Sequence, residues 1–326
     1  MSALLEIESL RVRFRTLGPL KARLTGVADP FIDAVCDVSL AIEEGETLGL
    51  VGESGSGKST LARAVMGLVP VAEGSISVAG ERIDGLGARA LAPYRRRMAM
   101  MFQDPVGSLS PRLTVRSLLA EPFKIHGVGG RDLDAEVRRL LGLVGLTPDF
   151  AGRFPHQLSG GQARRVGVAR ALALEPRLII ADEPTAGLDV SVQGEVLNLL
   201  ARLQGELGLS ILIITHNLNV VRHVTDRMAI MYLGRFVEQG PTEEVFHRPR
   251  HPYTEALLSA NPEPDPDAVL NRVEIRGEVP SLQHRPPGCE FHTRCLYARE
   301  RCRLDPPGVS IEGPAHRYTC HFPLGG

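Results

Sequence analysis

The sequence lacks long apolar runs, and four of its five cysteines lie after residue 286. No apolar run approaches the roughly 18 residues of a membrane-spanning helix. The stretch "MSALLEIESLRV" places acids among its apolar residues and lacks the basic start of an export signal. We therefore expect the chain to stay in the cytosol, where thiols remain reduced. Any role at a membrane would then depend on a partner.

An excess of charge of either sign is also missing. The formal net charge is −1, whereas non-specific binding to nucleic acid depends on Lys and Arg that neutralise phosphates. We therefore expect no nucleic-acid partner, and we interpret the basic run Arg95–Arg97 as a solvated helix face. The content of 43% hydrophobic and 23% charged residues is ordinary for a soluble globular protein.

Short apolar runs alternate with longer helical patterns, which indicates an α/β fold with a largely parallel sheet. The runs that we expect to form strands are 4–14, 46–52, 97–102, 177–182, 210–216 and 228–234. The stretch between Arg15 and Asp33 contains Gly and Pro and indicates a loop insertion. Frequent prolines after about His251 indicate an appended module, so we place a domain boundary near residue 250.

The stretch "GESGSGKS", here called the phosphate loop (Gly52–Ser59), lies between a predicted strand and a helical pattern. Its glycines let backbone N–H groups face phosphates, Lys58 supplies a point charge, and Ser59 offers a hydroxyl to Mg²⁺. The chain has only three lysines against 34 arginines, so a lysine at position 58 is an exception. A compact ammonium enters a backbone cradle that a planar guanidinium does not fit. The sequence therefore predicts binding of a nucleoside triphosphate.

Two acidic residues, Asp182 and Glu183, follow the apolar run 178–181. An acid at the end of a buried strand near a phosphate loop can hold Mg²⁺, a role that fits Asp182. Glu183 is then placed to polarise an attacking water as a general base. Asp-Glu pairs alone are usually structural, and it is the phosphate loop that favours catalysis here.

Polar residues also end two other predicted strands. His216 ends "ILIITH" and Gln103 ends "MAMMFQ". A histidine at such a position is, by itself, more often a satisfied polar strand end, and the amide of Gln103 could touch either metal or water. Because open α/β sheets gather ligands beyond the carboxyl ends of their strands, we interpret these residues and Asp182 as parts of one site.

The stretch "LSGGQ" places Ser159, Gly160 and Gly161 directly before a helical run. The free N–H groups at a helix N-terminus attract anions, so these residues are a second candidate phosphate contact. It lies about a hundred residues after the first contact. One nucleotide could use both contacts if two subunits face each other head to tail.

In this order and combination, the phosphate loop, "LSGGQ", the Asp182–Glu183 pair, "AGLD" and His216 resemble the ATP-binding-cassette (ABC) ATPases. The resemblance implies a P-loop NTPase fold of class α/β, with a RecA-like core, a helical subdomain at about 93–173 and a small C-terminal module. It also implies that ATP drives the closure of a dimer. The residues that it assigns to the partner subunit's ATP are Ser159, Gly160, Gly161 and Gln162.

The resemblance also implies individual roles in the ATP site. Glu183 would be the base, His216 would steady the γ-phosphate, and Asp189 would belong to a loop that communicates between the two sites. Ser59, Gln103 and Asp182 would serve Mg²⁺. The adenine would stack on Phe14, with Phe31 as the alternative. The residues expected to cradle phosphate are Gly52, Glu53, Ser54, Gly55, Ser56, Gly57, Lys58, Ser59 and Thr60.

A narrower resemblance covers nearly the whole chain. The stretches "MMFQDPVGSLSPRLTV", "DVSVQGEVLNLL", "HPYTEALLSANPEPD" and "RPPGCEFHTRC" are similar to the ATPase subunits of oligopeptide and dipeptide importers, although "TAGLD" departs from the "SALD" common there. This implies an ABC ATPase domain at 1–250 and the family's C-terminal module at 251–326. The chain would be a translocase ATPase on the cytoplasmic face of the membrane.

The implied partners are a second ABC ATPase, identical or related, two membrane permease subunits and an extracytoplasmic substrate-binding protein. The segment after Gln103 would touch the permease. An importer of the same family that carries nickel or another small solute is one alternative, and a soluble ABC ATPase outside transport is another. A P-loop kinase would leave "LSGGQ" without a role.

Five, six and seventeen residues separate Cys289, Cys295, Cys302 and Cys320. These gaps are wider than those of zinc fingers and match neither ferredoxin pattern. The residues alone leave open an iron–sulfur cluster, a zinc ion or reduced thiols. The histidines that could replace a cysteine as ligand are His292, His316 and His321.

The family resemblance favours a 4Fe-4S cluster on the four cysteines, because some importer ATPases carry one in this module. A proline-rich module of about 75 residues has little core, and a metal would add the missing stability. The remaining cysteine, Cys36, lies in a strand-like segment, and we expect it to be a small buried hydrophobe.

Overall fold

The structure is a computed structural model, and it describes residues 3–18, 30–102, 104, 107–260, 273 and 275–325. The chain divides into two compact units, which are described separately. Unit 1 comprises Met1–Leu5, Ile42–Thr47 and Val78–Ile214, and unit 2 comprises Glu6–Ala41, Leu48–Ser77 and Thr215–Gly326.

The centre of unit 1 is a parallel sheet of β6 (Met98–Met101), β7 (Leu178–Asp182) and β8 (Ser210–Thr215). β7 pairs with both neighbours, with Leu178 opposite Met98 on one side and Ser210 on the other. Every residue of β7 and β8 is buried, as expected of parallel strands that helices cover on both faces. Because the strands are parallel, their carboxyl ends lie at one edge of the sheet.

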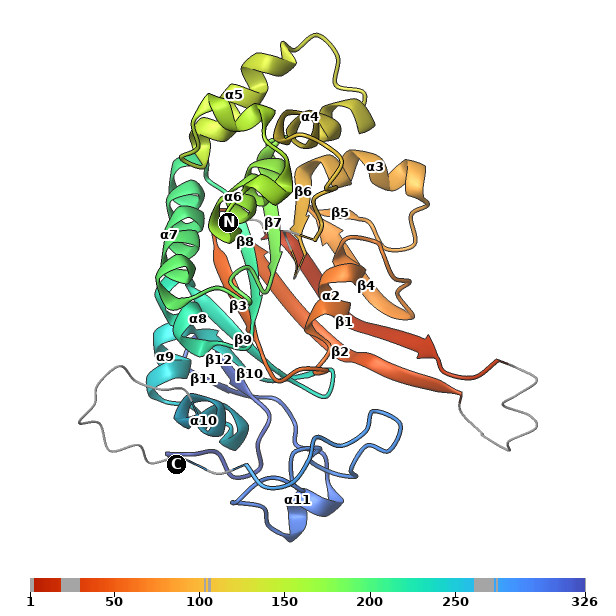
Figure 1. The fold of residues 1–326 in the computed structure, drawn as a ribbon. Helices are drawn as coiled ribbons and strands as arrows, with labels where there is room; N and C mark the ends of the chain where they lie inside the picture. The colour runs from red at the N-terminus through yellow and green to blue at the C-terminus, as the bar shows by residue number, and fades with distance from the viewer. Residues whose placement is uncertain are drawn as a thin grey trace. The chain divides into compact units, whose positions relative to one another are not determined.

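Helices make up most of the rest of unit 1, and Figure 1 shows α4, α5 and α6 close to one another. Four of them begin at a side chain that accepts a backbone hydrogen bond, namely Thr114, Asp132, Ser159 and Asp189. The elements are β5 (Glu81–Arg82), α3 (Ala88–Arg97), α4 (Val115–Ile125), α5 (Leu133–Leu143), the 3₁₀ helices η1 (Pro148–Gly152) and η2 (Pro155–Gln157), α6 (Gly160–Leu172) and α7 (Val190–Leu207).

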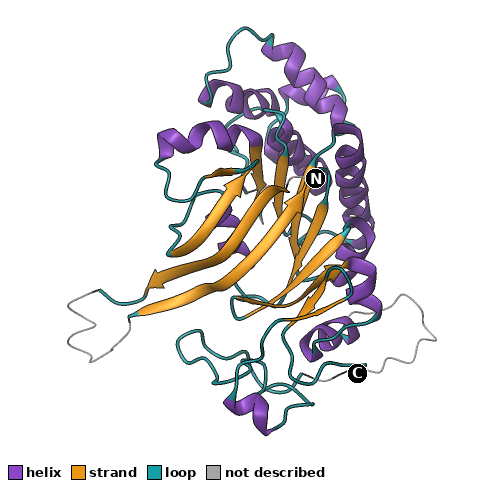
Figure 2. Ribbon diagram, turned by 180° about the vertical axis from the view of Figure 1, so that it is seen from behind, coloured by secondary structure: helices purple, strands orange, loops and turns teal. Residues whose placement is uncertain are grey.

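Unit 2 contains most of two long strands, β1 (Ala3–Arg15) and β2 (Phe31–Glu43), which are neighbours in one sheet and are seen from behind in Figure 2. β4 (Glu73–Val78) lies on the other side of β1. A second set of strands begins with β3 (Thr47–Val51), which pairs in parallel with β9 (Arg227–Tyr232). β9 forms an antiparallel pair with β10 (Arg235–Pro241).

The C-terminal residues extend this second set of strands. β12 (His316–Tyr318) pairs antiparallel with β10, and β11 (Ser310–Glu312) pairs with β12. The helices of unit 2 are α2 (Lys58–Val65), α8 (Leu218–Val224), α9 (Thr242–His247), α10 (Pro252–Ser259) and α11 (Glu300–Leu304). Residues beyond 250 are therefore part of the same compact unit as the phosphate loop.

Three aromatic side chains join the C-terminal residues to β9. The ring centroid of Tyr232, the last residue of β9, lies 4.8 Å from that of Tyr253 in α10 and 5.3 Å from that of Phe291. The rings of Tyr253 and Phe291 are 5.2 Å apart. All three side chains are almost completely buried, and contacts of this kind add to the free energy gained from burial.

The six predicted strands are confirmed as β1, β3, β6, β7, β8 and β9. Residues 19–29 of the predicted insertion lie outside the described residues, and the loop ends earlier than predicted because β2 begins at Phe31. Cys36 lies in β2 with 2% of its surface exposed, which confirms it as a buried residue. The predicted boundaries at 93–173 and near 250 remain predictions.

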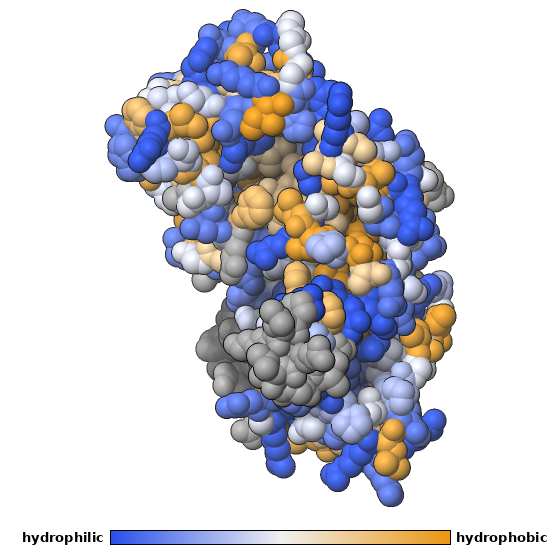
Figure 3. Space-filling view, turned by 90° about the vertical axis from the view of Figure 1, so that its right-hand side faces the viewer, coloured by the Kyte–Doolittle hydropathy of each residue, from blue (hydrophilic) through white to orange (hydrophobic). Residues whose placement is uncertain are grey.

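In the described part of the chain, no helix combines the length and the apolar character needed to cross a bilayer. Figure 3 shows hydrophilic and hydrophobic residues intermingled on one face of the molecule.

A buried carboxylate, Glu238 of β10, organises the start of α10. It accepts hydrogen bonds from the backbone N–H groups of Arg250 and His251 at 2.7 and 2.9 Å and lies 2.7 Å from Nε2 of His316. Nδ1 of His251 in turn accepts the N–H of Tyr253 at 3.0 Å and caps the helix. Only the neutral imidazole can accept this bond. Burial lowers the pKa of His251 from 6.5 to about 4, against the opposing effect of Glu238.

We expect acid to destabilise the protein through His251. Between the two pKa values the unfolded chain binds a proton that the folded chain does not, so stability falls as the pH drops from about 6.5 towards 4. The loss between pH 7.5 and 5.5 should be about 1 kcal/mol. His251→Asn retains a capping acceptor without a titrating group, and it should reduce this loss in urea unfolding at the two pH values.

The matched control for this measurement is His247→Asn, because the side chain of His247 is exposed at the end of α9. This control should keep the pH dependence of the wild type. An undiminished loss of stability in the His251 variant would show that another group causes it.

Candidate functional site

The phosphate loop joins β3 to α2 and lies close to the backbone of two other strands. A Cβ atom at Gly52 would lie 2.2 Å from the carbonyl oxygen of Met231, and one at Gly57 would lie 2.4 Å from that of Ala34. Gly57 also has a φ of +106°, which other residues rarely adopt. The path of the loop therefore requires glycine at both positions.

Lys58, the first residue of α2, has its ammonium group inside the curl of the loop. Nζ donates to the carbonyl oxygens of Gly52 and Glu53 at 2.7 and 2.8 Å and to Oγ of Ser56 at 3.3 Å. Only 7% of Lys58 is exposed. Ser59 and Thr60 follow in the first turn of α2, whereas Ser54 and Gly55 are exposed at the tip of the loop. The loop thus has the curled backbone and the inward cation that the motif predicts.

Glu53 is held by two residues that the sequence analysis did not select. Arg294 forms an ion pair with its carboxylate, and the hydroxyl of Tyr253 accepts its backbone N–H at 2.9 Å. Both partners come from the region beyond residue 250. No sequence pattern connects Arg294 with Glu53, which lies 241 residues earlier in the chain.

Unit 1 holds the carboxylate pair at the end of β7. Asp182 is the last residue of the strand and is 4% exposed. Glu183 follows it with a φ of +50°, a left-handed conformation that costs a residue other than glycine about 1 kcal/mol or more. Its N–H donates to the carbonyl of Ile214 at 2.8 Å, and its own carbonyl accepts the N–H of Ala186 at 3.1 Å. Backbone strain of this kind is concentrated at functional sites.

The segment after Glu183 is tied to α6 by Arg164, another residue that the sequence analysis missed. Nη2 of Arg164 donates to the carbonyl of Ala186 at 2.9 Å. Arg164 is 4% exposed, and burial lowers the pKa of its guanidinium. This bond connects the helix that follows "LSGGQ" with the loop that follows the carboxylate pair.

The "LSGGQ" stretch forms the predicted helix N-terminus in unit 1. Oγ of Ser159 accepts the N–H of Gln162 at 3.2 Å, and Oε1 of Gln162 accepts the N–H of Ser159 at 3.0 Å, which together form a capping box. Residues 159–162 and Asp189 line one cavity of about 750 Å³. Asp189 caps α7 by accepting the N–H of Val192 at 3.0 Å. The structure therefore brings Asp189 and the "LSGGQ" residues together.

The remaining predicted residues are distributed between the units. His216 directly follows β8, is exposed and belongs to unit 2, as does the phosphate loop. Gln103 lies outside the described residues. Phe14 lies in β1, and Phe31 is 40% exposed at the start of β2, with the guanidinium carbons of Arg13 and Arg15 at 5.2 and 5.7 Å from its ring centroid. The choice between Phe14 and Phe31 for adenine remains a prediction.

The four C-terminal cysteines line one small cavity in unit 2, here called the cysteine pocket (Cys289, Cys295, Cys302 and Cys320). None of the four forms a disulfide bond. Burial raises the pKa of Cys295 to about 11 and that of Cys320 to about 12, so these thiols are neutral near pH 7. A bound metal would have to displace their protons. The cavity is also lined by His251, His292 and His321.

The geometry of the cysteine pocket does not by itself indicate a metal site. Within the described ranges, no group of three or more His, Cys, Asp or Glu side chains is placed to hold one metal ion. Zinc would need its sulfur ligands at about 2.3 Å from one centre.

Comparison with known families supports the family resemblance that these motifs indicate. The family model described as ABC transporter matches residues 35–186. The one described as oligopeptide/dipeptide transporter, C-terminal region, matches residues 237–302, which include three of the four tail cysteines.

Curated relatives match over almost the full chain. The oligopeptide transport ATP-binding protein OppF of Salmonella typhimurium is 46% identical over 324 residues, or 97% of this chain and 95% of OppF. AppF of Bacillus subtilis is 46% identical over 295 residues, or 89% and 90% of the two chains. A probable peptide ABC transporter ATP-binding protein of Sinorhizobium fredii is 46% identical over 320 residues, or 98% and 90%.

Solved structures support the fold. The dimeric ATP-binding cassette MJ0796, bound to ADP and phosphate, is similar with a TM-score of 0.64 and 29% identity over 73% of this chain and 98% of that one. The cassette cbiO1 of Clostridium perfringens has a TM-score of 0.63 and 29% identity over 76% and 92%. Because the likeness includes both the nucleotide-binding motifs and the cysteine-containing tail, the chain belongs to the ABC ATPases of the oligopeptide and dipeptide transporter family.

Proposed function

We propose that this chain is the ATP-hydrolysing subunit of an importer for oligopeptides or dipeptides. The observation that carries the proposal is the 46% identity to oligopeptide transport ATP-binding proteins over almost the entire chain, tail included. The phosphate loop, with Lys58 held inside it, supports ATP as the nucleotide. Neither a nickel importer nor a soluble ABC ATPase outside transport gains support from these relatives.

The proposed ATP-site residues have separate roles. Residues Gly52–Thr60 would surround the phosphates, where the ammonium of Lys58 would exchange loop carbonyls for phosphate oxygens. Ser59 and Asp182 would hold Mg²⁺ together with Gln103, since a hard cation takes oxygen ligands such as hydroxyl and carboxylate. When bound, Mg²⁺ neutralises charge on the phosphates. His216 would contact the γ-phosphate.

Glu183 is the proposed general base. Its fixed backbone, bonded to Ile214 and Ala186, holds the side chain at the carboxyl end of β7, next to the carboxylate proposed for Mg²⁺. A base must keep its position relative to the attacking water, and a strained but over-determined backbone provides that rigidity. Glu183 would take the proton of the water that attacks the γ-phosphate.

The family works as a dimer of ATPase subunits with membrane permease partners. The helix N-terminus at Ser159 and the cap residue Asp189 share a cavity, which suits a site for the phosphates bound by the opposite subunit. In this arrangement each subunit completes the ATP site of the other. Asp189 would transmit the closure of one ATP site to the other.

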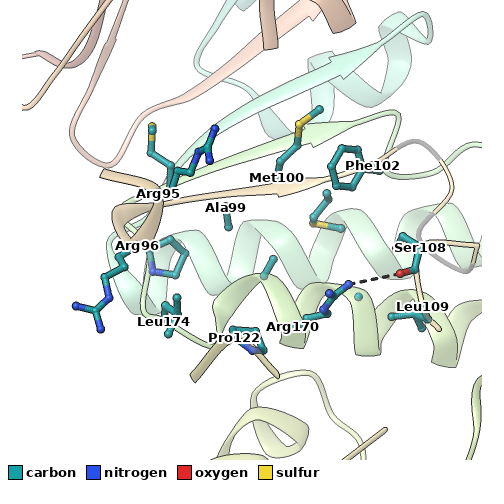
Figure 4. Close-up of a pocket in the computed structure, with 15 residues that line it drawn as sticks. Arg95, Arg96, Ala99, Met100, Phe102, Ser108, Leu109, Pro122, Arg170 and Leu174 are labelled. Atoms are coloured by element: carbon teal, nitrogen blue, oxygen red, sulfur yellow. Dashed lines mark hydrogen bonds between the residues drawn. The ribbon is translucent and has the colours of Figure 1, made fainter. Parts of the chain in front are cut away.

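Figure 4 shows a cavity of unit 1 that supports a contact with the permease. It has a volume of about 230 Å³ and lies beside the end of β6 and the segment that follows it. Phe102 is 46% exposed there, and Arg170 of α6 donates to the carbonyl of Ser108 at 3.4 Å. A permease segment in this cavity would cover exposed apolar surface and place the chain on the cytoplasmic face of the membrane, where a binding protein on the other side would supply the peptide.

For the cysteine pocket we propose a 4Fe-4S cluster. Its four cysteines line one small cavity, and the match of this region to the family's C-terminal model supports a shared role for them. A bound cluster would cross-link a region that has few regular elements of its own and would stabilise it.

Glu183→Gln should bind ATP with an affinity within about twofold of the wild type and lose hydrolysis by at least about a hundredfold, since it keeps the shape but not the basicity of the side chain. Phosphate release and nucleotide titration would measure the two effects. Size-exclusion chromatography with ATP should show a dimer that persists. Glu206→Gln on α7, an exposed carboxylate paired with Arg202, is the matched control and should hydrolyse ATP normally. Wild-type turnover by the Glu183 variant would remove it as the base.

Anaerobic purification should give a brown protein with broad absorbance and about four irons per chain. Cys295→Ser should lose most of the iron, whereas Cys36→Ser, outside the cysteine pocket, should keep it. Metal analysis that finds zinc in place of iron, or a colourless protein that takes up no iron on reconstitution, would refute the cluster.

A further inference from the structure

The phosphate loop is bonded to the cysteine-containing tail through one side chain. Nη1 of Arg294 donates to Oε2 of Glu53 at 2.7 Å, and Nη2 donates to Oε1 at 3.0 Å. This is a two-bond pairing of a planar guanidinium with a carboxylate, the geometry in which such pairs are strongest. Glu53 is the second residue of the phosphate loop, and Arg294 directly precedes Cys295.

The ion pair is shielded from water. The side chain of Arg294 is 7% exposed and that of Glu53 is 25% exposed. A surface ion pair contributes little because solvent screens it, but removing one partner of a shielded pair leaves the other charge uncompensated. The guanidinium also lies 5.8 Å from the ring centroid of Tyr232. The pair is therefore a fixed contact of unit 2.

A second bond from the same region fixes the backbone of Glu53. The hydroxyl of Tyr253 accepts its N–H at 2.9 Å, while its carbonyl accepts the ammonium of Lys58 at 2.8 Å. The backbone of this one residue thus connects the C-terminal region with one of the carbonyl groups that hold Lys58. Tyr253 and Arg294 together determine the direction of the peptide groups at the start of the loop.

Arg294 is itself held by the tail. Its N–H donates to the carbonyl of Phe291 at 3.0 Å, in a short turn that runs from Cys289 to Cys295. The ring of Phe291 packs against Tyr253 and Tyr232. The two residues that hold Glu53 therefore belong to one packed cluster, and both shift if that cluster shifts.

We propose that Arg294 is a positioning residue for ATP binding: by holding Glu53, the C-terminal region keeps the phosphate loop in the shape that accepts the nucleotide. This inference rests on the proposed function, because it assumes that the loop binds ATP. A loop that is already in its binding conformation loses no further conformational entropy when phosphate binds. Loss of the bonds between Arg294 and Glu53 lowers the fraction of molecules whose phosphate loop can accept ATP. The apparent affinity for ATP falls by the same factor.

The test is a double-mutant cycle on the full chain. Arg294→Gln and Glu53→Gln should each weaken binding of a fluorescent ATP analogue about tenfold, and KM for ATP should rise by a similar factor while kcat changes less than about threefold. The double variant should bind no worse than either single variant, because residues that act as a pair are not additive. Arg294→Lys keeps the charge without the two-bond geometry and should fall between wild type and Arg294→Gln.

Arg250→Gln is the matched control, because Arg250 is a half-buried arginine of the same region that bonds to Leu324 and Glu312 and not to the phosphate loop. It should leave ATP affinity unchanged even where it lowers Tm. Unchanged affinity in folded Arg294→Lys and Glu53→Gln, or an equal loss of affinity in Arg250→Gln, would overturn the inference while leaving the proposed function intact. Absence of ATP binding by the wild-type chain would instead overturn the proposed function.

Discussion

The close approach of the phosphate loop to the end of β9 is the constraint on which unit 2 depends. Gly52 lies so near the carbonyl of Met231 that a single added carbon would meet it at 2.2 Å, and the N–H of Gly234, just beyond β9, donates to the carbonyl of Ser56 at 2.8 Å. These are backbone contacts, so no change of rotamer can relieve a clash there. The same stretch of β9 carries Tyr232, whose ring packs against Tyr253 and Phe291. Through these ring contacts the C-terminal residues are packed beside the loop.

Unit 1 positions its functional groups in a different way, through a sheet edge and helix caps. The carboxyl ends of β6, β7 and β8 share one edge of a parallel sheet, and helix caps arrange the polar residues near it. Ser159 and Asp189 are each the N-cap of a helix, and the side chain of each accepts a hydrogen bond from a backbone N–H. Ser159, proposed to contact the partner subunit's ATP, and Asp189, proposed for communication between the two sites, are thus also the residues that define where α6 and α7 start. A change in either cap would alter both helix position and the shared cavity.

The sequence was sufficient to predict what depends on local order along the chain. The six apolar runs became strands, and the phosphate loop and the "LSGGQ" cap lie where their motifs place them, because a glycine pattern or a capping box is a property of neighbouring residues. The partners of Glu53 could not be predicted, since Arg294 and Tyr253 meet it only through the tertiary fold. The left-handed backbone of Glu183 could not be predicted either, because residues other than glycine, asparagine and aspartate rarely adopt it. Strand β2 was anticipated only as a strand-like segment around Cys36, because charged residues interrupt its apolar pattern.

The division of the chain into two units has a consequence for synthesis on the ribosome. Unit 1 is built mainly from the continuous segment Val78–Ile214, whereas unit 2 combines three separate segments, the last of which is the C-terminal 215–326. Contacts between distant parts of a chain form late, because the intervening segment must first be closed into a loop. The phosphate loop therefore leaves the ribosome 241 residues before the arginine that secures it. Nascent chains carry an ATP motif long before they carry the arginine that supports it, so the phosphate loop reaches its full affinity for nucleotide only after residue 294 has been synthesised.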